Sequence, residues 1–189
     1  MRLFVAIDLD DRSRAAIAAE QERIRRAAQA TQPRWTNRDQ LHLTVAFLGE
    51  VDPPLAELVQ QDLAEPVALN PFDLVLGGLG VFPPHGAPRA LWIGARSGSA
   101  ELLALHQELS SRLARRAIPR ETRPFSPHLT IARWKASRPS DRRRVLQHAT
   151  DRAIARVRID HATLYHSRLS SQGATYTRLA HAPLTASAG

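Results

Sequence analysis

Residues 127–133 read Pro127-His128-Leu129-Thr130-Ile131-Ala132-Arg133, and residues 41–47 read Leu41-His42-Leu43-Thr44-Val45-Ala46-Phe47. Both stretches contain His-Leu-Thr followed by a β-branched aliphatic residue and alanine, a composition typical of β-strands. Side chains alternate between the two faces of a strand, so the histidine and threonine of each stretch share one face. Each stretch therefore predicts a short strand with an apolar back and an imidazole and a hydroxyl on its front.

The elements expected around these two strands repeat in the same order. Each half is predicted to run strand, long helix, polar loop, His-Leu-Thr strand, helix and strand. The remaining elements are expected at residues 2–8, 10–30, 31–40, 53–64 and 72–81, and then at 89–94, 99–117, 118–126, 140–147 and 153–168, with a last strand at 175–179. The pattern predicts a single domain, residues 1–189, with pseudo-symmetric halves of about 1–86 and 87–182. Two such halves would bring the faces of His42 and His128 together across a groove.

Composition narrows the class of protein. Hydrophobic residues make up 43% of the chain, which suffices for a core, and the lack of cysteine excludes disulfides and thiolate metal sites. The first apolar run, residues 3–7, ends at Asp8 and is too short for the apolar region of a signal peptide. No stretch approaches the length of a membrane span. We therefore expect a soluble, cytoplasmic protein that does not bind membranes, and a monomer.

The formal charge is +8, and Lys135 is the only lysine among the basic residues. The planar guanidinium group of arginine suits phosphate, so the charge favours a polyanionic partner such as nucleic acid. An arginine-rich surface that only contacts solvent is the alternative.

Two facing imidazoles predict acid–base chemistry. Because the ordinary pKa of histidine lies near neutrality, one ring can remove a proton from water while the other protonates a leaving oxygen. The two threonine hydroxyls can donate to oxygens on which negative charge develops, as in a phosphodiester. The acids nearest in sequence are Asp39, Glu50 and Glu121, outside the two stretches, and two histidines rarely complete a metal site. We therefore expect no metal and no other cofactor.

The stretches His42-Leu43-Thr44-Val45 and His128-Leu129-Thr130-Ile131 resemble the paired His-x-Thr/Ser-x motifs of the two-histidine (2H) phosphoesterases. The wider context is similar to the LigT-like RNA 2′,3′-cyclic phosphodiesterases, through residues 3–8, 42–51, 88–92, 125–133 and 173–176. The resemblance implies an α+β, bilobal fold in which two antiparallel sheets line a central groove and helices pack outside. It also implies metal-independent hydrolysis of a terminal RNA 2′,3′-cyclic phosphate to a 2′-phosphomonoester.

The same resemblance implies roles for five residues. His42 would be the proton donor to the departing 3′-oxygen, and His128 the proton acceptor that acts on water. Thr44 and Thr130 would hold the phosphate, and Arg133 would add positive charge. The residues themselves do not fix the order of the two histidines. Strict alternation places Arg133 on the apolar back of its strand, so a β-bulge or a strand end is needed to bring it to the front.

Other interpretations remain open. A non-catalytic RNA- or nucleotide-binding module is one, and a related 2H enzyme acting on small cyclic nucleotides or joining RNA ends is another. Trp35 and Tyr176 are candidates for stacking on a base, whereas core packing is favoured for Phe47 and Phe82. The run 142–144, three arginines, either contacts RNA or lies on a solvated helix face.

Overall fold

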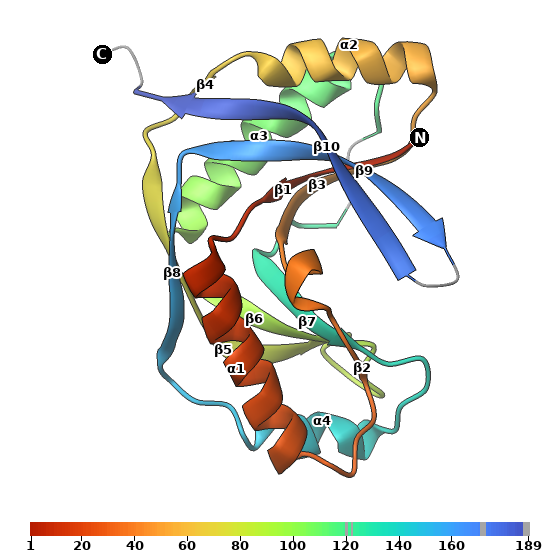
Figure 1. Ribbon diagram of the computed structural model, residues 1–189, viewed down its shortest axis with the longest axis vertical. Helices are drawn as coiled ribbons and strands as arrows, with labels where there is room; N and C mark the ends of the chain where they lie inside the picture. Colours follow the sequence, from red (N-terminus) through yellow and green to blue (C-terminus); the bar gives the residue numbers. More distant parts are fainter. Residues whose placement is uncertain (120, 122, 171–172, 187–189) are drawn as a thin grey trace.

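In the computed structural model, which describes residues 1–119, 121, 123–170 and 173–186, ten strands form two five-stranded sheets (Figure 1). The first sheet has the order β3 (Leu43–Glu50), β1 (Arg2–Ile7), β9 (His161–Ser170), β10 (Gly173–Thr185) and β4 (Val67–Ala68). The second has the order β2 (Arg34–Trp35), β7 (His128–Arg133), β6 (Ala90–Ser97), β5 (Phe72–Phe82) and β8 (Ala153–Ile159). The neighbouring strands are antiparallel except for the short parallel pair of β10 and β4. The predicted α+β fold with two sheets is confirmed.

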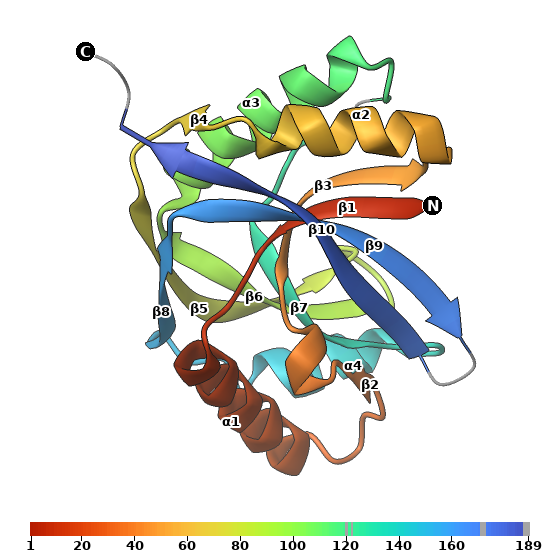
Figure 2. The same ribbon diagram turned by 45° about the horizontal axis from the view of Figure 1, so that its top comes forward.

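Helices cover the outer side of each sheet (Figure 2). Helices α2 (Pro53–Ala64) and α3 (Ser99–Arg115) pack on the first sheet, and α1 (Asp11–Ala27) and α4 (Pro139–Leu146) pack on the second. The carboxylates of Asp10 and Asp52 cap α1 and α2, accepting from the backbone N–H groups of Ser13 at 2.6 Å and Leu55 at 2.8 Å. No helix within the described ranges is long and apolar enough to cross a membrane.

The two halves of the sequence interlock. Helix α1 follows β1 of the first sheet but packs against β8 of the second, and α3 follows β6 of the second sheet but packs against β3 of the first. Strand β5 pairs with β6 and β8, whereas β9 and β10 complete the sheet that begins with β1. Each sheet thus contains strands from both halves, and the boundary expected near residue 86 falls in the connection between β5 and β6.

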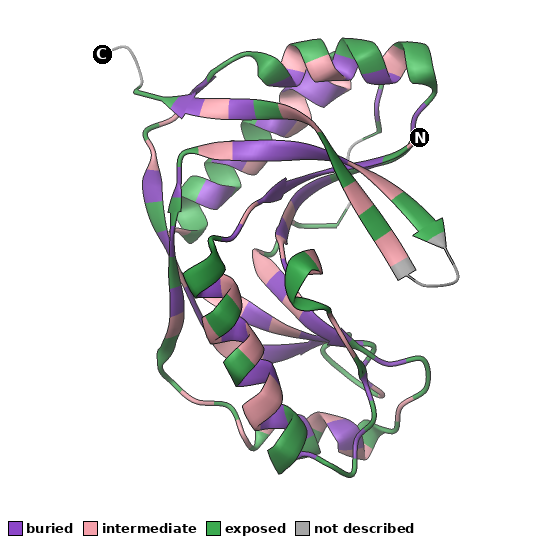
Figure 3. Cartoon of the chain, in the orientation of Figure 1, coloured by how far each residue is buried: buried purple, intermediate pink, exposed green. Residues whose placement is uncertain are grey.

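The apolar backs of both His-Leu-Thr strands lie in the core. Leu43, Leu129 and Ile131 have no exposed surface, and Val45 is 2% exposed. Figure 3 shows buried and exposed positions recurring along α1, and Ile17 and Ile24 are among the buried residues of this helix. Burial of these aliphatic faces holds the polar fronts of β3 and β7 in place.

Three expected elements differ from the structure. The strand expected over 153–168 is two strands in different sheets, because the chain crosses from one sheet to the other at Asp160. The expected polar loop 31–40 contains β2 and a 3₁₀ turn, η1 (Arg38–Gln40), since β2 pairs with β7. The last strand runs well beyond the expected 175–179. The loop expected over 118–126 includes residues 120 and 122, which lie outside the described residues.

Each His-Leu-Thr strand carries a β-bulge one residue after its threonine. In the β1–β3 pair, Ala6 faces Thr44 and Val5 faces Ala46, so Val45 has no partner. In the β6–β7 pair, Trp92 faces Thr130 and Leu91 faces Ala132, so Ile131 has none. The extra residue reverses the alternation beyond it.

Candidate active site

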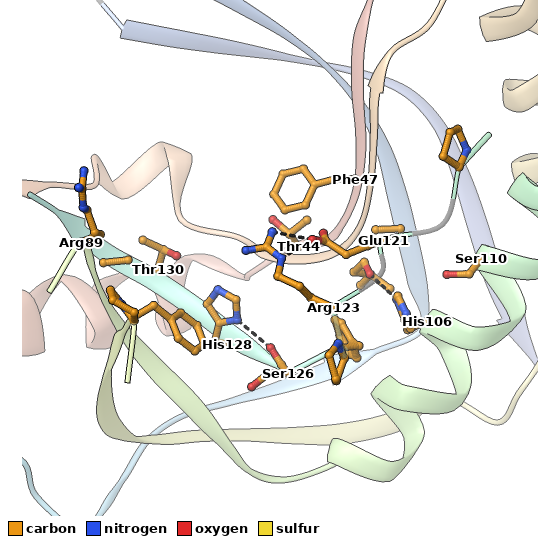
Figure 4. Close-up of a pocket in the computed structure, with 18 of the residues that line it drawn as sticks. Thr44, Phe47, Arg89, His106, Ser110, Glu121, Arg123, Ser126, His128 and Thr130 are labelled. Atoms are coloured by element: carbon orange, nitrogen blue, oxygen red, sulfur yellow. Dashed lines mark hydrogen bonds and ion pairs between the residues drawn. The ribbon is translucent and has the colours of Figure 1, made fainter. Parts of the chain in front are cut away.

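The main cavity lies between the two sheets and has a volume of about 720 Å³, a size typical of small-ligand sites (Figure 4). Strand β3 contributes residues 44–47 to its lining, and β7 contributes His128, Thr130 and Arg133. The bulge in β7 therefore brings Arg133 to the front face of the strand, beside His128 and Thr130, as the alternation of the sequence required. Residues 82–84, 89 and 90, three positions of α3 and the segment after α3 complete the described lining.

His42 opens into a second pocket of about 250 Å³. This pocket is polar and is lined in addition by Asp8, Arg14, Asp39, Leu41, Tyr165, Tyr176 and Arg178. The structure thus places four of the five predicted site residues in the main cavity and His42 in a pocket of its own. The two pockets adjoin, because His42 and Thr44 lie two residues apart and β3 packs against β7. The charge of Arg133 contributes to the pKa of both His42 and His128, so it acts on both pockets.

Both imidazoles are held in the same way. The Nδ1 atom of His42 lies 2.7 Å from the carbonyl oxygen of Gln40, and that of His128 lies 2.7 Å from the carbonyl oxygen of Ser126. A carbonyl only accepts hydrogen bonds, so each Nδ1 carries a hydrogen and donates it. The Nε2 atom of each ring is therefore the one that takes up or releases a proton.

Aromatic rings wall in His42. The ring of Phe4 lies 4.9 Å from it, and Tyr176 meets it edge-on at 5.3 Å and 90°. Tyr176, a candidate for stacking on a base, is thus a neighbour of the first histidine and lines its pocket.

Aromatic rings also wall in His128. Phe82 meets it edge-on at 4.9 Å, and Trp92 lies 6.1 Å away. A Cβ atom on Gly80 would lie 2.0 Å from the indole ring of Trp92, so only glycine leaves room for this wall.

The electrostatic surroundings of the two histidines differ by one carboxylate. Burial lowers the pKa of His42, and Arg14 and Arg133 lower it further, whereas the hydrogen bond to a carbonyl and the charge of Asp8 raise it. Burial also lowers the pKa of His128, together with Arg133, and the bond to its carbonyl opposes this. A negatively charged side chain therefore favours the protonated form at His42 alone.

Asp8 sits at the centre of a hydrogen-bonded cluster. Its carboxylate accepts a hydrogen bond from the Tyr165 hydroxyl and one of 2.8 Å from the Thr163 hydroxyl. The Arg178 guanidinium lies 3.9 Å from it, and His161 lies 3.7 Å from it. Burial alone would raise the pKa of Asp8, but the two hydrogen bonds and these positive charges hold it below its usual value. Asp8 is consequently ionised near neutral pH.

The contact of Asp8 with the site of His42 was not predicted, because Asp8 lies far from both motifs in the chain. Asp8 follows β1, and β1 pairs with the strand that His42 precedes, so the contact arises from sheet pairing. The sequence did offer one indication, because Asp8 is an acid placed directly after the first apolar strand. Asp39, the nearest acid in sequence, does line the same pocket.

Helices from across the fold hold both bulges. The Nδ1 atom of His106, on α3, lies 2.7 Å from the carbonyl oxygen of Val45. The side-chain amide of Gln21, on α1, donates to the carbonyl oxygens of Ile131 at 2.8 Å and Thr36 at 2.9 Å. Bulge residues have no partner in the strand ladder, so these side chains supply hydrogen bonds that the ladder does not, and the Ile131 carbonyl accepts a second one from the N–H of Thr36.

The other residues considered for contact with RNA lie at the cavity, against the core and beside the loop after β5. Phe47 is 54% exposed and lines the cavity, so the expectation that it packs in the core is wrong. Trp35 packs against the core. Arg142 donates to the carbonyl oxygens of Pro83 at 2.7 Å and Gly86 at 3.1 Å, so it braces the loop that borders the cavity.

Across the described parts of the chain, no three histidine, aspartate or glutamate side chains form a group that could hold a metal ion.

The geometry defines a two-lobed fold with twin histidine strands, and comparison with known proteins gives the family. The sequence model of the 2′-5′ RNA ligase superfamily matches residues 14–170. The chain therefore belongs to this superfamily of LigT-like proteins. A Methanocaldococcus jannaschii relative is 32% identical over 93% of this chain and 96% of its own length. A Thermus thermophilus relative is 35% identical over 74% of this chain and 71% of its own. Both relatives are named RNA 2′,3′-cyclic phosphodiesterase.

Solved structures agree on the fold. Escherichia coli LigT complexed with 3′-AMP superimposes with a TM-score of 0.77 at 29% identity, over 97% of this chain and 98% of that one. A Thermus thermophilus protein gives 0.75 at 29% identity, over 98% and 99%. Kluyveromyces marxianus Usb1, at 14% identity, shares the fold with a TM-score of 0.57.

Proposed function

We propose that the protein hydrolyses a terminal RNA 2′,3′-cyclic phosphate to a 2′-phosphomonoester by acid–base catalysis with His42 and His128. The observation that carries the proposal is the matched state of the two imidazoles, each with Nδ1 bound to a carbonyl oxygen two residues earlier. The family and the names of its members agree with this reaction.

The proposed reaction has one chemical step. Nε2 of His128 takes a proton from water as the oxygen of that water attacks phosphorus. The bond from phosphorus to the ribose 3′-oxygen breaks, and the protonated Nε2 of His42 transfers its proton to that oxygen. The hydroxyls of Thr44 and Thr130 donate to the non-bridging oxygens, and Arg133 supplies positive charge where negative charge develops. The products are a 3′-hydroxyl and a 2′-phosphate, with His128 protonated and His42 neutral.

The order of the two histidines rests on Asp8. Burial lowers the pKa of both imidazoles, but the Asp8 carboxylate lines the pocket of His42 and opposes the lowering there. A proton donor must start the reaction protonated, which suits His42, and a base must start it neutral, which suits His128.

The remainder of the main cavity suits a nucleoside. Away from the histidine, threonines and arginine, apolar side chains line the cavity, among them Phe47, Phe82, Phe125 and Leu113. Exposed aromatic rings stack on unpaired bases. Phe47 projects into the cavity three residues after Thr44, within reach of a base whose phosphate is held at Thr44 and Thr130.

A product assay tests the proposal. An oligonucleotide with a 2′,3′-cyclic phosphate is incubated with the protein in EDTA, and the new end is identified. We expect a 2′-phosphate, formed without added metal. A 3′-phosphate would mean that the 2′-oxygen leaves, and activity that requires a divalent cation would overturn the metal-independent mechanism. Binding without turnover would favour the non-catalytic RNA-binding alternative.

The superfamily's name supports a second candidate reaction. If the 5′-hydroxyl of another RNA replaces water, the same two histidines join the ends through a 2′-5′ bond. Addition of a 5′-hydroxyl RNA to the assay distinguishes the two, because joining produces a longer strand and hydrolysis does not.

A further inference from the structure

Arg34 and Arg133 lie directly opposite each other in the pairing of β2 with β7. Strand β2 lies beside β7 and forms one edge of the second sheet (Figure 1). Side chains of opposed residues in an antiparallel pair project from the same face. Since Arg133 lines the main cavity, Arg34 stands on the cavity side as well, one strand further out.

The backbone around Arg34 is anchored to the site. The N–H of Thr36 donates to the carbonyl oxygen of Ile131 at 2.9 Å. The Thr36 hydroxyl donates to the carbonyl oxygen of Thr130 at 3.2 Å. Trp35, whose side chain projects from the other face of the short strand, packs against the core. The position of Arg34 is thus set by the strand that carries the predicted phosphate ligand Thr130.

The two opposed arginines repel each other, and no carboxylate among the described residues offsets this repulsion. Like charges directly opposite each other destabilise a sheet. Among the described residues, neither guanidinium has a carboxylate partner, although many other arginines do, including Arg23 with Glu20 at 2.7 Å and Arg116 with Asp62 at 2.7 Å. An anion bound between the two side chains would remove the repulsion, and arginine binds phosphate oxygens well.

We propose that Arg34, together with Arg133, binds the phosphodiester that joins the last two nucleotides of an RNA substrate. The inference rests on the proposed function, in which the terminal phosphate lies at Thr44 and Thr130. An RNA that ends in a 2′,3′-cyclic phosphate continues only toward its 5′ end, so this phosphodiester is the next anion. Neighbouring strands lie about 4.8 Å apart, which lets the two long side chains contact one phosphodiester from both sides. A cyclic mononucleotide without a 5′-phosphate lacks this contact, so the site selects RNA ends.

A binding experiment tests this without turnover. Two ligands are titrated calorimetrically: 3′-AMP, with one phosphate, and the dinucleotide ApA with a 3′-terminal phosphate, with two. We expect the wild type to bind the dinucleotide more tightly. Arg34→Gln should weaken dinucleotide binding about tenfold, as the loss of one charged hydrogen bond would, and change the Kd of 3′-AMP less than about twofold. The slope of log K against log salt should fall by about one for the dinucleotide alone.

Two further variants sharpen the test. Arg34→Lys keeps the charge and should retain most of the dinucleotide affinity. Arg158→Gln makes the same change in charge on β8, at the opposite edge of the sheet, and should leave both affinities unchanged. Equal losses for both ligands in Arg34→Gln, no loss, or an equal effect in Arg158→Gln would overturn the proposal. A protein that binds as expected but hydrolyses nothing would instead overturn the proposed function.

Discussion

At the scale of single residues, the two histidines share a tautomer, a carbonyl partner two residues upstream and an aromatic wall. They differ in their ionic surroundings, because Asp8 acts on His42 and no carboxylate contributes to the pKa of His128. In the proposed reaction, this difference suits the two histidines, which share one sequence motif, to opposite proton transfers. The difference comes from a residue outside both motifs.

Replacement of either histidine should remove catalysis and keep the fold. We expect His42→Ala and His128→Ala each to lower kcat about 10²- to 10⁴-fold, since each removes one proton-transfer group. Initial rates on a 2′,3′-cyclic dinucleotide and thermal unfolding curves measure the two properties. His85→Ala, in an exposed loop, is the matched control. Full activity in both single variants would contradict the mechanism.

The pH profile should reveal which histidine is the acid. Activity requires one neutral and one protonated imidazole, so kcat/KM should be bell-shaped, and its alkaline limb follows the pKa of the acid. Burial lowers the pKa of His42, and the charge of Asp8 opposes that lowering. Asp8→Asn should therefore lower that pKa and move the alkaline limb to lower pH. If His42 were the base, the acidic limb would move to lower pH instead, and the assignment of roles would be reversed.

At the scale of elements, the two bulges decide which side chains reach the cavity. Without the extra residue in β7, Arg133 would project into the core with Leu129 and Ile131. The same shift in β3 sends Phe47 into the cavity at the corresponding position. One bulge thus presents a charge to the cavity and the other a ring, which agrees with the proposed binding of a phosphate and a base.

Loss of the Gln21 contact should loosen the second bulge. Gln21→Ala leaves the Thr36 carbonyl without its side-chain donor and takes one of two donors from the Ile131 carbonyl. We expect the free energy of unfolding to fall by about 1–3 kcal/mol and kcat/KM to fall as well, because Thr130 and Arg133 flank the bulge. Urea denaturation and steady-state kinetics measure both.

Gln60→Ala provides the control, since the side chain of Gln60 donates to the Ala56 carbonyl within its own helix. If Gln21→Ala lost stability but kept full kcat/KM, the contact would support the fold without positioning the site.

At the scale of the whole molecule, each sheet is shared between the two halves of the chain. Strands β9 and β10 belong to the sheet of β1 and β3, whereas β5 belongs to the sheet of β6 and β7. The helices cross over in the same way. The cavity between the sheets therefore depends on the complete interlocked fold.

Neither half should fold alone. Residues 1–86 and 87–189, produced separately, each lack strands that cover apolar sheet surface, so we expect both to lack a cooperative thermal transition in circular dichroism. When mixed, they should regain a transition and activity. A cooperatively folded half would show that the lobes are autonomous and that the interlocking is not required.

Much of this arrangement followed from local patterns in the amino-acid order. The strand periodicity of the two His-Leu-Thr stretches, their apolar backs and the helices could be predicted because each depends on neighbours within a few residues, and the duplication showed in the repeated order of these elements. The need for a bulge before Arg133 could be read for the same reason. The split of residues 153–168 between two sheets could not, because a strand pattern does not name its partner.

The features that distinguish the two halves of the site required long-range packing. Sheet pairing brings Asp8 to His42, crossover helices bring Gln21 and His106 to the bulges, and the β2–β7 pair sets Arg34 against Arg133. These contacts join residues far apart in the chain, so no local pattern encodes them. The order of residues alone thus specified two nearly equivalent histidine strands, and the packing of the interlocked sheets made them chemically different.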